Sequence, residues 1–355
     1  MPKRDDQGDQ PVQRHQNSQH EERHPRDQPE SIVQSDRIER IERAAGLPGL
    51  AEALATRLSA PDLQALLLEV ARRRARARTP ARVLQDYERD VYLRPALTPP
   101  ARLAEWERVL LRALPVEVEV LALSPLAPLG TSSVVASVPQ DWAITTVRAA
   151  EVVSDLTNVL ALEAASRRRR AGARRVDTHL AAHHRLIRGQ RFAGADQRQH
   201  FALFGMVSAG RDRGTLRFEL AAAHMQLQTY FTALFAYRQD QPALRLALTL
   251  LGPDAAAVAS RRALVEQHLV DPLHRAFPLV DIGYDDERAR GRGYYRDLCF
   301  QVDAATADGA WSNLVDGGAV TWTASLLSDA KERAVISGIG SERACAMTTG
   351  RATEV

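Results

Sequence analysis

The chain has 355 residues, 45% of them apolar and 26% charged, so it can build one large domain with appendages or two modest domains. Its 47 basic and 44 acidic residues give a formal net charge of only +3, which excludes a histone-like polycation. Its two cysteines exclude a disulfide framework and fit a reducing cytosol. No apolar run approaches the roughly 18 residues of a membrane span, and the N-terminus lacks a signal-peptide pattern, so we expect a soluble, cytoplasmic protein without a membrane partner.

Composition and spacing divide the chain into three parts. Residues 1–36 contain almost no apolar side chains, which predicts a disordered tail because no buried surface offsets the entropy of ordering. In residues 37–99 the apolar residues recur three and four positions apart, with a break at Pro61, which predicts a small helical module. Residues 100–355 then form the main domain.

Helical and strand patterns follow one another irregularly in the main domain. We expect helices at residues 101–113, 155–170, 215–237 and 255–269, and strands at residues 116–123, 142–147, 199–209, 244–251 and 294–302. A strict alternation of strands and helices is missing. The order therefore predicts an α+β fold, in which a mostly antiparallel sheet is flanked by helices and preceded by the small helical module.

Residues 184–191 and 198–204 have the pattern of two strands joined by a polar loop that is rich in arginine. A guanidinium group binds phosphate or carboxylate in two places, and Phe201 on the returning strand can offer its ring to a purine. A surface hairpin with solvated arginines explains the same composition, and composition alone favours that simpler interpretation.

Two glycine-containing segments have the residue types of a ligand site. Residues 336–343 predict a strand that passes through Gly338 and Gly340 into a helix start, where small residues let a ligand approach the backbone. Residues 290–295, of sequence RGRGYY, either place arginines and tyrosine hydroxyls in a pocket or form a turn before a core strand.

Taken in order, these segments resemble the catalytic core of class II aminoacyl-tRNA synthetases, most closely the histidyl-tRNA synthetase branch, over about residues 100–347. The helix, strand and proline order at residues 101–128 resembles the first signature of that class, which builds the dimer interface. The resemblance therefore implies a homodimer.

The second and third signatures of the class imply an ATP site. In the second, Arg188 holds the α-phosphate of ATP, Phe201 stacks on adenine, and Gln190 stands where the family has glutamate. The third resembles residues 338–343, so Arg343 meets the γ-phosphate beside the two ATP-binding glycines, Gly338 and Gly340. The family also uses Mg²⁺, for which Glu219 and Asp316 are candidate ligands.

Two further segments resemble the amino-acid site of the family. Residues 154–157 resemble its proline-glutamate-any-threonine element, which implies that Asp155 takes an α-amino group and Thr157 lines the site; simple helix capping by both residues is the alternative.

Residues 290–295 resemble an element specific to the histidyl branch. The resemblance implies that Arg290 is a catalytic arginine and that Tyr294 and Tyr295 line the pocket. Gly293 replaces an aspartate of this element, and residues 317–321 (GGAVT) replace a second element of that branch, so histidine specificity is not expected.

These features lead to three hypotheses. The first, which the sequence favours, is a stand-alone core that binds ATP and a small amino or carboxylic acid and adenylates the carboxylate, with Arg188, Arg290 and Arg343 neutralising charge. The second is a non-catalytic regulator of a partner enzyme, like the regulatory subunit of ATP phosphoribosyltransferase. The third is nucleic-acid binding through the arginines of residues 167–175. Because the chain continues only to residue 355, we expect no anticodon-binding domain and no tRNA partner.

Overall fold

The computed structural model describes residues 30–172, 176–190, 199–238, 243–252, 254–306 and 309–347. The chain divides into two compact units, residues 1–66 and 67–355, and the division falls inside helix α3 (Ala60–Arg76). That the main domain begins at residue 100 stays a prediction.

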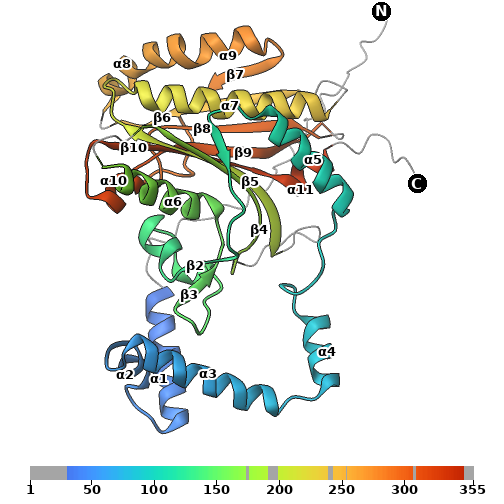
Figure 1. Cartoon of the computed structure of the whole chain (residues 1–355), viewed down its shortest axis with the longest axis vertical. Coiled ribbons are helices and arrows are strands. Elements are labelled where there is room, and N and C mark those ends of the chain that lie inside the picture. Colours follow the sequence, from blue (N-terminus) through green and yellow to red (C-terminus); the bar gives the residue numbers. More distant parts are fainter. Residues whose placement is uncertain are drawn as a thin grey trace, which may run out of the picture. The chain divides into compact units, whose positions relative to one another are not determined.

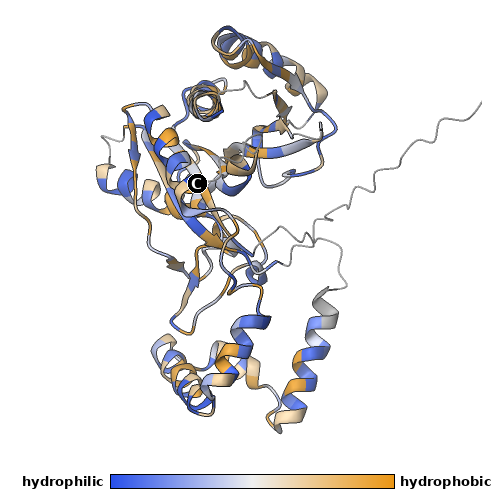
Figure 2. Ribbon diagram, turned by 90° about the vertical axis from the view of Figure 1, so that its right-hand side faces the viewer, coloured by the Kyte–Doolittle hydropathy of each residue, from blue (hydrophilic) through white to orange (hydrophobic). Residues whose placement is uncertain are grey.

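The predicted helical module consists of α1 (Glu30–Ala45), α2 (Leu50–Thr56), α3 and α4 (Pro80–Arg89). Helix α1 begins inside the segment that composition assigned to the tail, whose first 29 residues lie outside the described ranges. Helices α2, α3 and α4 have no buried residue, and apolar side chains such as Leu84 remain exposed. Figure 2 shows hydrophilic and hydrophobic residues alternating along these helices.

An eight-stranded sheet forms the centre of the unit of residues 67–355, with the order β1-β4-β5-β10-β9-β8-β6-β7. Only the outermost pairs, β1 with β4 and β6 with β7, are parallel among the strands of this sheet, so the predicted mostly antiparallel sheet is confirmed. Its strands are β1 (Val118–Val120), β4 (Thr178–Ile187), β5 (His200–Arg211), β6 (Leu244–Leu250), β7 (Val280–Tyr284), β8 (Arg296–Ala305), β9 (Trp311–Val320) and β10 (Glu332–Gly340).

Helices cover both faces of this sheet, as Figure 1 shows. On one face, α5 and α7 pack over a core that contains Phe204, Tyr230 and Phe300. On the other, α6 and α10 cover a second core that contains Leu160 and Val207. The remaining elements of the unit are α5 (Pro100–Ala113), β2 (Leu126–Pro128), the π-helical turn η1 (Thr131–Val135), the 3₁₀ turn η2 (Gln140–Trp142), β3 (Ala150–Val152), α6 (Leu156–Ala171), α7 (Arg217–Tyr237), α8 (Ala255–Val265), the π-helical turn η4 (Glu266–Val270), α9 (Asp271–Ala276), α10 (Trp322–Leu327) and α11 (Ser341–Ala346).

Buried polar groups join α7 to the sheet. The Gln226 amide donates to Ser208 Oγ and to the Val335 carbonyl, both at 3.1 Å, and its oxygen accepts from Ser337 Oγ at 2.7 Å. Burial of a polar group is tolerated when its hydrogen bonds are made, so this network fixes the position of α7 on the sheet.

The strand predictions need correction at residues 142–147, and the strands at residues 126–128, 150–152, 280–284 and 311–320 were not predicted. Residues 142–147 do not form a strand: Gln140–Trp142 is a 3₁₀ turn after Pro139, and only Thr145 makes an isolated β-bridge. Strand β9 was not predicted, because Gly317 and Gly318 interrupt its pattern. Glycine is needed there, since a Cβ at residue 317 would lie 2.5 Å from the Phe300 ring.

Within the described ranges, none of the helices combines the length and the apolar character that a membrane span requires.

Candidate functional site

The sheet register brings a row of four residues together on the face that α6 covers. Gly205 pairs with Gly338, Gly338 with Asp316, and Asp316 with Gln301. Directly paired residues share a face of the sheet. Leu156 of α6 covers Gly205, whereas the other three residues of the row stay partly exposed. Through Leu156, the row lies beside the first turn of α6, and we take it as the floor of the candidate site.

Arg188 lies at the edge of this floor, directly after β4. Its Nε donates to the Ser154 carbonyl at 3.1 Å, its Nη2 lies 3.5 Å from Asp155 Oδ2, and its guanidinium carbon lies 5.3 Å from the centre of the Phe201 ring. The next residue must be glycine, because a Cβ at Gly189 would lie 2.4 Å from the Asp141 carbonyl oxygen. The structure therefore brings Arg188, Asp155 and Phe201 together, as the sequence predicts.

Asp155 is the N-cap residue of α6. Its Oδ1 accepts hydrogen bonds from the Thr157 main-chain N–H at 2.9 Å and from Thr157 Oγ1 at 2.8 Å. Asp155 therefore does cap the helix, whereas Thr157 supplies the donors that it accepts. The cap leaves Oδ2 directed at Arg188, so the same carboxylate also faces the site. Thr157 is buried beneath it.

Tyr294 and Tyr295 lie next to Asp316 of this row. Their rings meet edge to face at 4.9 Å, and Tyr294 also packs edge-on against Trp322 at 5.5 Å. Tyr295 OH donates to Asp316 Oδ2 at 3.1 Å. Burial, and then the negative charge of Asp155, raise the pKa of Tyr294 well above its usual range, so its phenol stays neutral and can donate a hydrogen bond.

The arginine that enters the site is Arg288, which the sequence analysis missed. Its Nη2 donates to Asp316 Oδ1 at 2.6 Å, and its Nε donates to the Arg290 carbonyl at 2.9 Å. The side chain of Arg288 is 5% exposed, and its Nη1 is buried with no hydrogen-bond partner among the described residues.

Arg290, the predicted catalytic arginine, is exposed to solvent and joins this network only through its main-chain carbonyl. The glycine turn explains the difference. Gly291 has φ +79°, and a Cβ there would lie 2.7 Å from the Tyr295 ring, so the chain turns sharply between the two arginines and the tyrosines. The sequence does contain an arginine two residues before Arg290, and this residue is Arg288. The spacing of the two arginines alone does not indicate which of them is buried.

The third predicted segment spans the junction of β10 and α11. Gly338 and Gly340 pair with Gly205 and Leu203, and the side chain of Arg343 lies over the face of Gly340 that a Cβ would occupy, 3.7 Å from that position. Arg343 is exposed, and its Nη1 donates to the Asn313 carbonyl of β9 at 3.3 Å. It therefore lies on the site face, but toward β9, whereas Arg188 lies toward α6.

Other predicted groups are only partly described. Gln190 is the last described residue before a gap at residues 191–198, so the loop of the hairpin and Arg198 lie outside the described residues. Phe201 follows on β5 and is paired with Leu186 of β4.

The residues present do not fit a resident Mg²⁺ ion. The described residues contain no group of three or more His, Cys, Asp or Glu side chains placed to hold a metal. Both oxygens of Asp316 are engaged by Arg288 and Tyr295. Glu219 is buried on α7, on the other face of the sheet, with an ion pair of 3.1 Å to Arg333 Nε, so it is not part of this site.

The arginine cluster at the end of α6 has a structural role. Arg168 is buried and pairs with Glu332 of β10, with Nη2 3.1 Å from Oε1. Arg167 pairs with Glu163 at 2.7 Å and also with Glu119. These contacts contradict both a nucleic-acid surface at these two residues and a fully solvated helix end; Arg174 and Arg175 lie outside the described residues.

No family model matches the sequence, and no curated protein is similar to it in sequence. Solved structures do match the fold. A structure described as an ATP phosphoribosyltransferase regulatory subunit/histidyl-tRNA synthetase from Bacillus halodurans has 12% identity and a TM-score of 0.56, over 73% of this chain and 82% of that one. The histidyl-tRNA synthetase of S. aureus has 13% identity and a TM-score of 0.53, over 74% and 70% of the two chains. A histidine-tRNA ligase subunit from Alicyclobacillus acidocaldarius has 15% identity and a TM-score of 0.50, over 72% and 97%.

The chain has the catalytic-core fold of class II aminoacyl-tRNA synthetases. The predicted resemblance is thereby confirmed for the fold. At such low identity the likeness does not extend to activity, because ligand binding depends on the side chains of the site and not on the fold.

Proposed function

We propose that this class II core binds a small amino acid in the site formed by Asp155, Arg288 and Asp316, and that it acts as a ligand-responsive regulator of a partner enzyme. The observation that carries the proposal is the orphan Nη1 of Arg288. A buried donor without a partner costs free energy, and the carboxylate of a bound ligand would satisfy it once the groups that cover Nη1 move aside.

The opposite end of the site supplies the complementary charge for an ammonium group. Asp155 keeps Oδ2 free of the helix cap, and its 3.5 Å distance to Arg188 is long for an ion pair. A ligand with an ammonium group at Asp155 and a carboxylate at Arg288 is an amino acid, and the rings of Tyr294 and Tyr295 would line the space beside it.

Three features support regulation over adenylation. Arg290 is exposed, Gln190 replaces the glutamate of the family signature, and the Asp316 oxygens are already engaged by Arg288 and Tyr295. A regulator needs a partner protein, and the partner we propose is an enzyme whose activity follows the amino-acid level.

A second candidate function, ATP-dependent adenylation of the bound acid, is favoured by one specific arrangement. Arg188 stacks on Phe201, and Arg343 lies over Gly340 on the same face of the sheet, which is a suitable arrangement for a purine and its phosphates. The described residues do not form a site that would hold Mg²⁺ for such a reaction.

Calorimetric titration of the full chain with the proteinogenic amino acids, one at a time, tests the proposal. Arg288→Met removes the orphan donor at similar side-chain volume and should weaken binding by at least about tenfold, because a charge-assisted hydrogen bond is lost. Arg290→Met is the matched control and should bind as the unmodified chain does, since Arg290 is exposed.

The same titrations contain the contradicting outcomes. Saturable binding of no amino acid would refute the proposed ligand, and loss of affinity in Arg290→Met but not in Arg288→Met would restore Arg290 to the site. Exchange of pyrophosphate into ATP, stimulated by the amino acid that binds, would decide for adenylation over regulation.

A further inference from the structure

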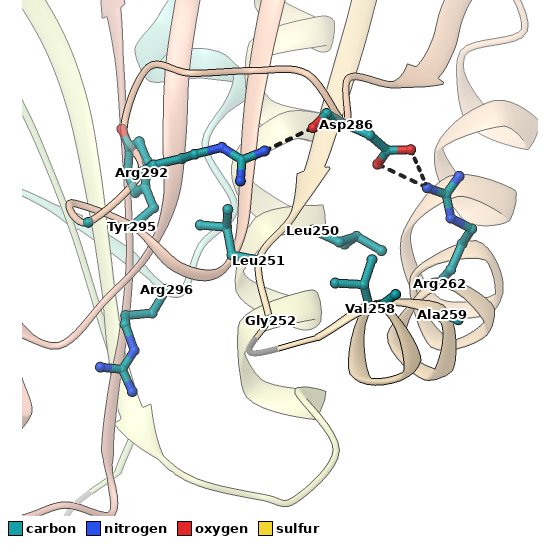
Figure 3. Close-up of a pocket in the computed structure, with 12 residues that line it drawn as sticks. Leu250, Leu251, Gly252, Val258, Ala259, Arg262, Asp286, Arg292, Tyr295 and Arg296 are labelled. Carbon is teal, nitrogen blue, oxygen red and sulfur yellow. Dashed lines mark hydrogen bonds and ion pairs between the residues drawn. The ribbon is translucent and has the colours of Figure 1, made fainter.

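A separate pocket lies on the other side of the loop that carries Arg288. It has a volume of about 640 Å³ and lies between the end of β6, the first turns of α8 and residues 286–296, as Figure 3 shows. We name it the α8 pocket. Its lining is apolar along β6 and most of α8, through Leu250, Leu251 and Val258. It is charged at Arg262 of α8 and on the loop side, through Asp286 and Arg292. Pockets of this size hold ordinary small-molecule ligands.

The α8 pocket carries an excess of positive charge. Arg262 is neutralised by Asp286, whose two carboxylate oxygens accept from its Nη2 at 3.0 and 2.8 Å. Arg292 instead donates to two main-chain carbonyls, those of Arg288 at 2.7 Å and Asp286 at 2.9 Å. Carbonyl oxygens satisfy hydrogen bonds but do not remove the net charge of the guanidinium.

Arg292 is also the charged residue whose side chain extends along the pocket. Figure 3 shows its guanidinium extended across Leu251 toward Asp286, whereas the side chain of Arg296 points away from the pocket. Beside them, Gly293 (φ +87°) has nothing within 4 Å of the position of a Cβ, so the loop side is not filled by protein atoms there. The pocket thus combines an apolar wall with one unneutralised positive charge.

We propose that the α8 pocket binds a small organic acid with an apolar body. The carboxylate would bind Arg292, and the apolar body would lie against Leu250, Leu251 and Val258. This ligand is distinct from the amino acid proposed above, because the α8 pocket offers no carboxylate for an ammonium group other than Asp286, which Arg262 already holds.

The two sites share one loop. The main-chain carbonyl that accepts from Arg292 belongs to Arg288, whose guanidinium binds Asp316 in the first site. Tyr295 lines the α8 pocket and also donates to Asp316. A ligand that draws Arg292 away from this carbonyl therefore acts directly on the loop that positions Arg288, and binding at the two sites is linked in both directions.

The test uses 4-phenylbutyrate and its uncharged amide, 4-phenylbutyramide, as a matched pair of probes in calorimetric titrations of the full chain. We expect the acid to bind at least about tenfold more tightly than the amide, as one charge-assisted hydrogen bond requires. Arg292→Gln should abolish this difference. Arg217→Gln, an exposed arginine of α7 away from the pocket, should preserve it.

A second pair of variants locates the binding independently of Arg292. Ala259→Trp places an indole in the pocket lining and should reduce the affinity for both probes, whereas Ser260→Trp, at the next exposed position of α8, should not. Equal affinities of acid and amide for the unmodified chain, absence of saturable binding of the acid, or undiminished binding by Ala259→Trp would each overturn the proposal. None of these results depends on whether an amino acid binds at Arg288, so the two proposals fail separately.

Discussion

The buried ion pair between Arg168 and Glu332 provides a quantitative test of how α6 is held on the sheet. The two side chains are 1% and 0% exposed, and Arg168 also donates to the Val176 carbonyl at 2.6 Å. Arg168→Leu leaves the Glu332 carboxylate buried, with Arg211 Nη1 3.6 Å away as a poorer, half-exposed partner. Breaking one side of a buried pair typically costs about 3–5 kcal/mol of unfolding free energy.

Urea unfolding, followed by circular dichroism, measures this cost. The double variant Arg168→Leu/Glu332→Leu should recover a large part of it, because replacing both partners removes the uncompensated charge as well as the attraction. A loss of less than about 1 kcal/mol in the single variant would refute the reasoning, since an exposed pair costs no more than that. A double variant as unstable as the single one would show that packing of Arg168, rather than charge, is what matters.

Two further predictions concern pH dependence and assembly. Burial lowers the pKa of His179 from 6.5, so below that pH the folded chain binds fewer protons than the unfolded chain and the free energy of unfolding falls as the pH drops. His179→Gln should flatten this part of the curve of unfolding free energy against pH, and an unchanged slope would contradict the prediction. The family resemblance of residues 101–128 predicts a two-fold dimer, and a monomer mass by light scattering at micromolar concentration would disprove that prediction.

Much of the fold follows from local patterns. Helix α7 and strands β5 and β10 lie close to their predicted positions, because each has a clear periodicity that its packing then uses. The grouping of Arg188 with Phe201 was also predictable, since both belong to one hairpin whose arginine and phenylalanine spacing is visible in the sequence.

The features that were missed depend on contacts between distant residues. Gly317 weakens the strand pattern of β9, and the reason for it is the ring of Phe300 on the neighbouring strand. Arg168 lies in a run of four arginines that is typical of a solvated helix end. Its burial is explained by its ion pair with Glu332, which is 164 residues away. Arg288 and Arg290 are equivalent in a linear pattern until the turn at Gly291 directs one inward.

The two acid–arginine pairs of the candidate site differ in strength, and this difference determines how a ligand would enter. Asp155 and Arg188 are 3.5 Å apart with side chains 26% and 32% exposed, so solvent screens their attraction and an incoming ammonium group displaces Arg188 at little cost. Asp316 and Arg288 are 2.6 Å apart, with Arg288 almost fully buried, so this pair stays closed and Nη1 of Arg288 remains the donor without a partner among the described residues. The amine of the proposed ligand is therefore directed to α6 and its carboxylate to the loop.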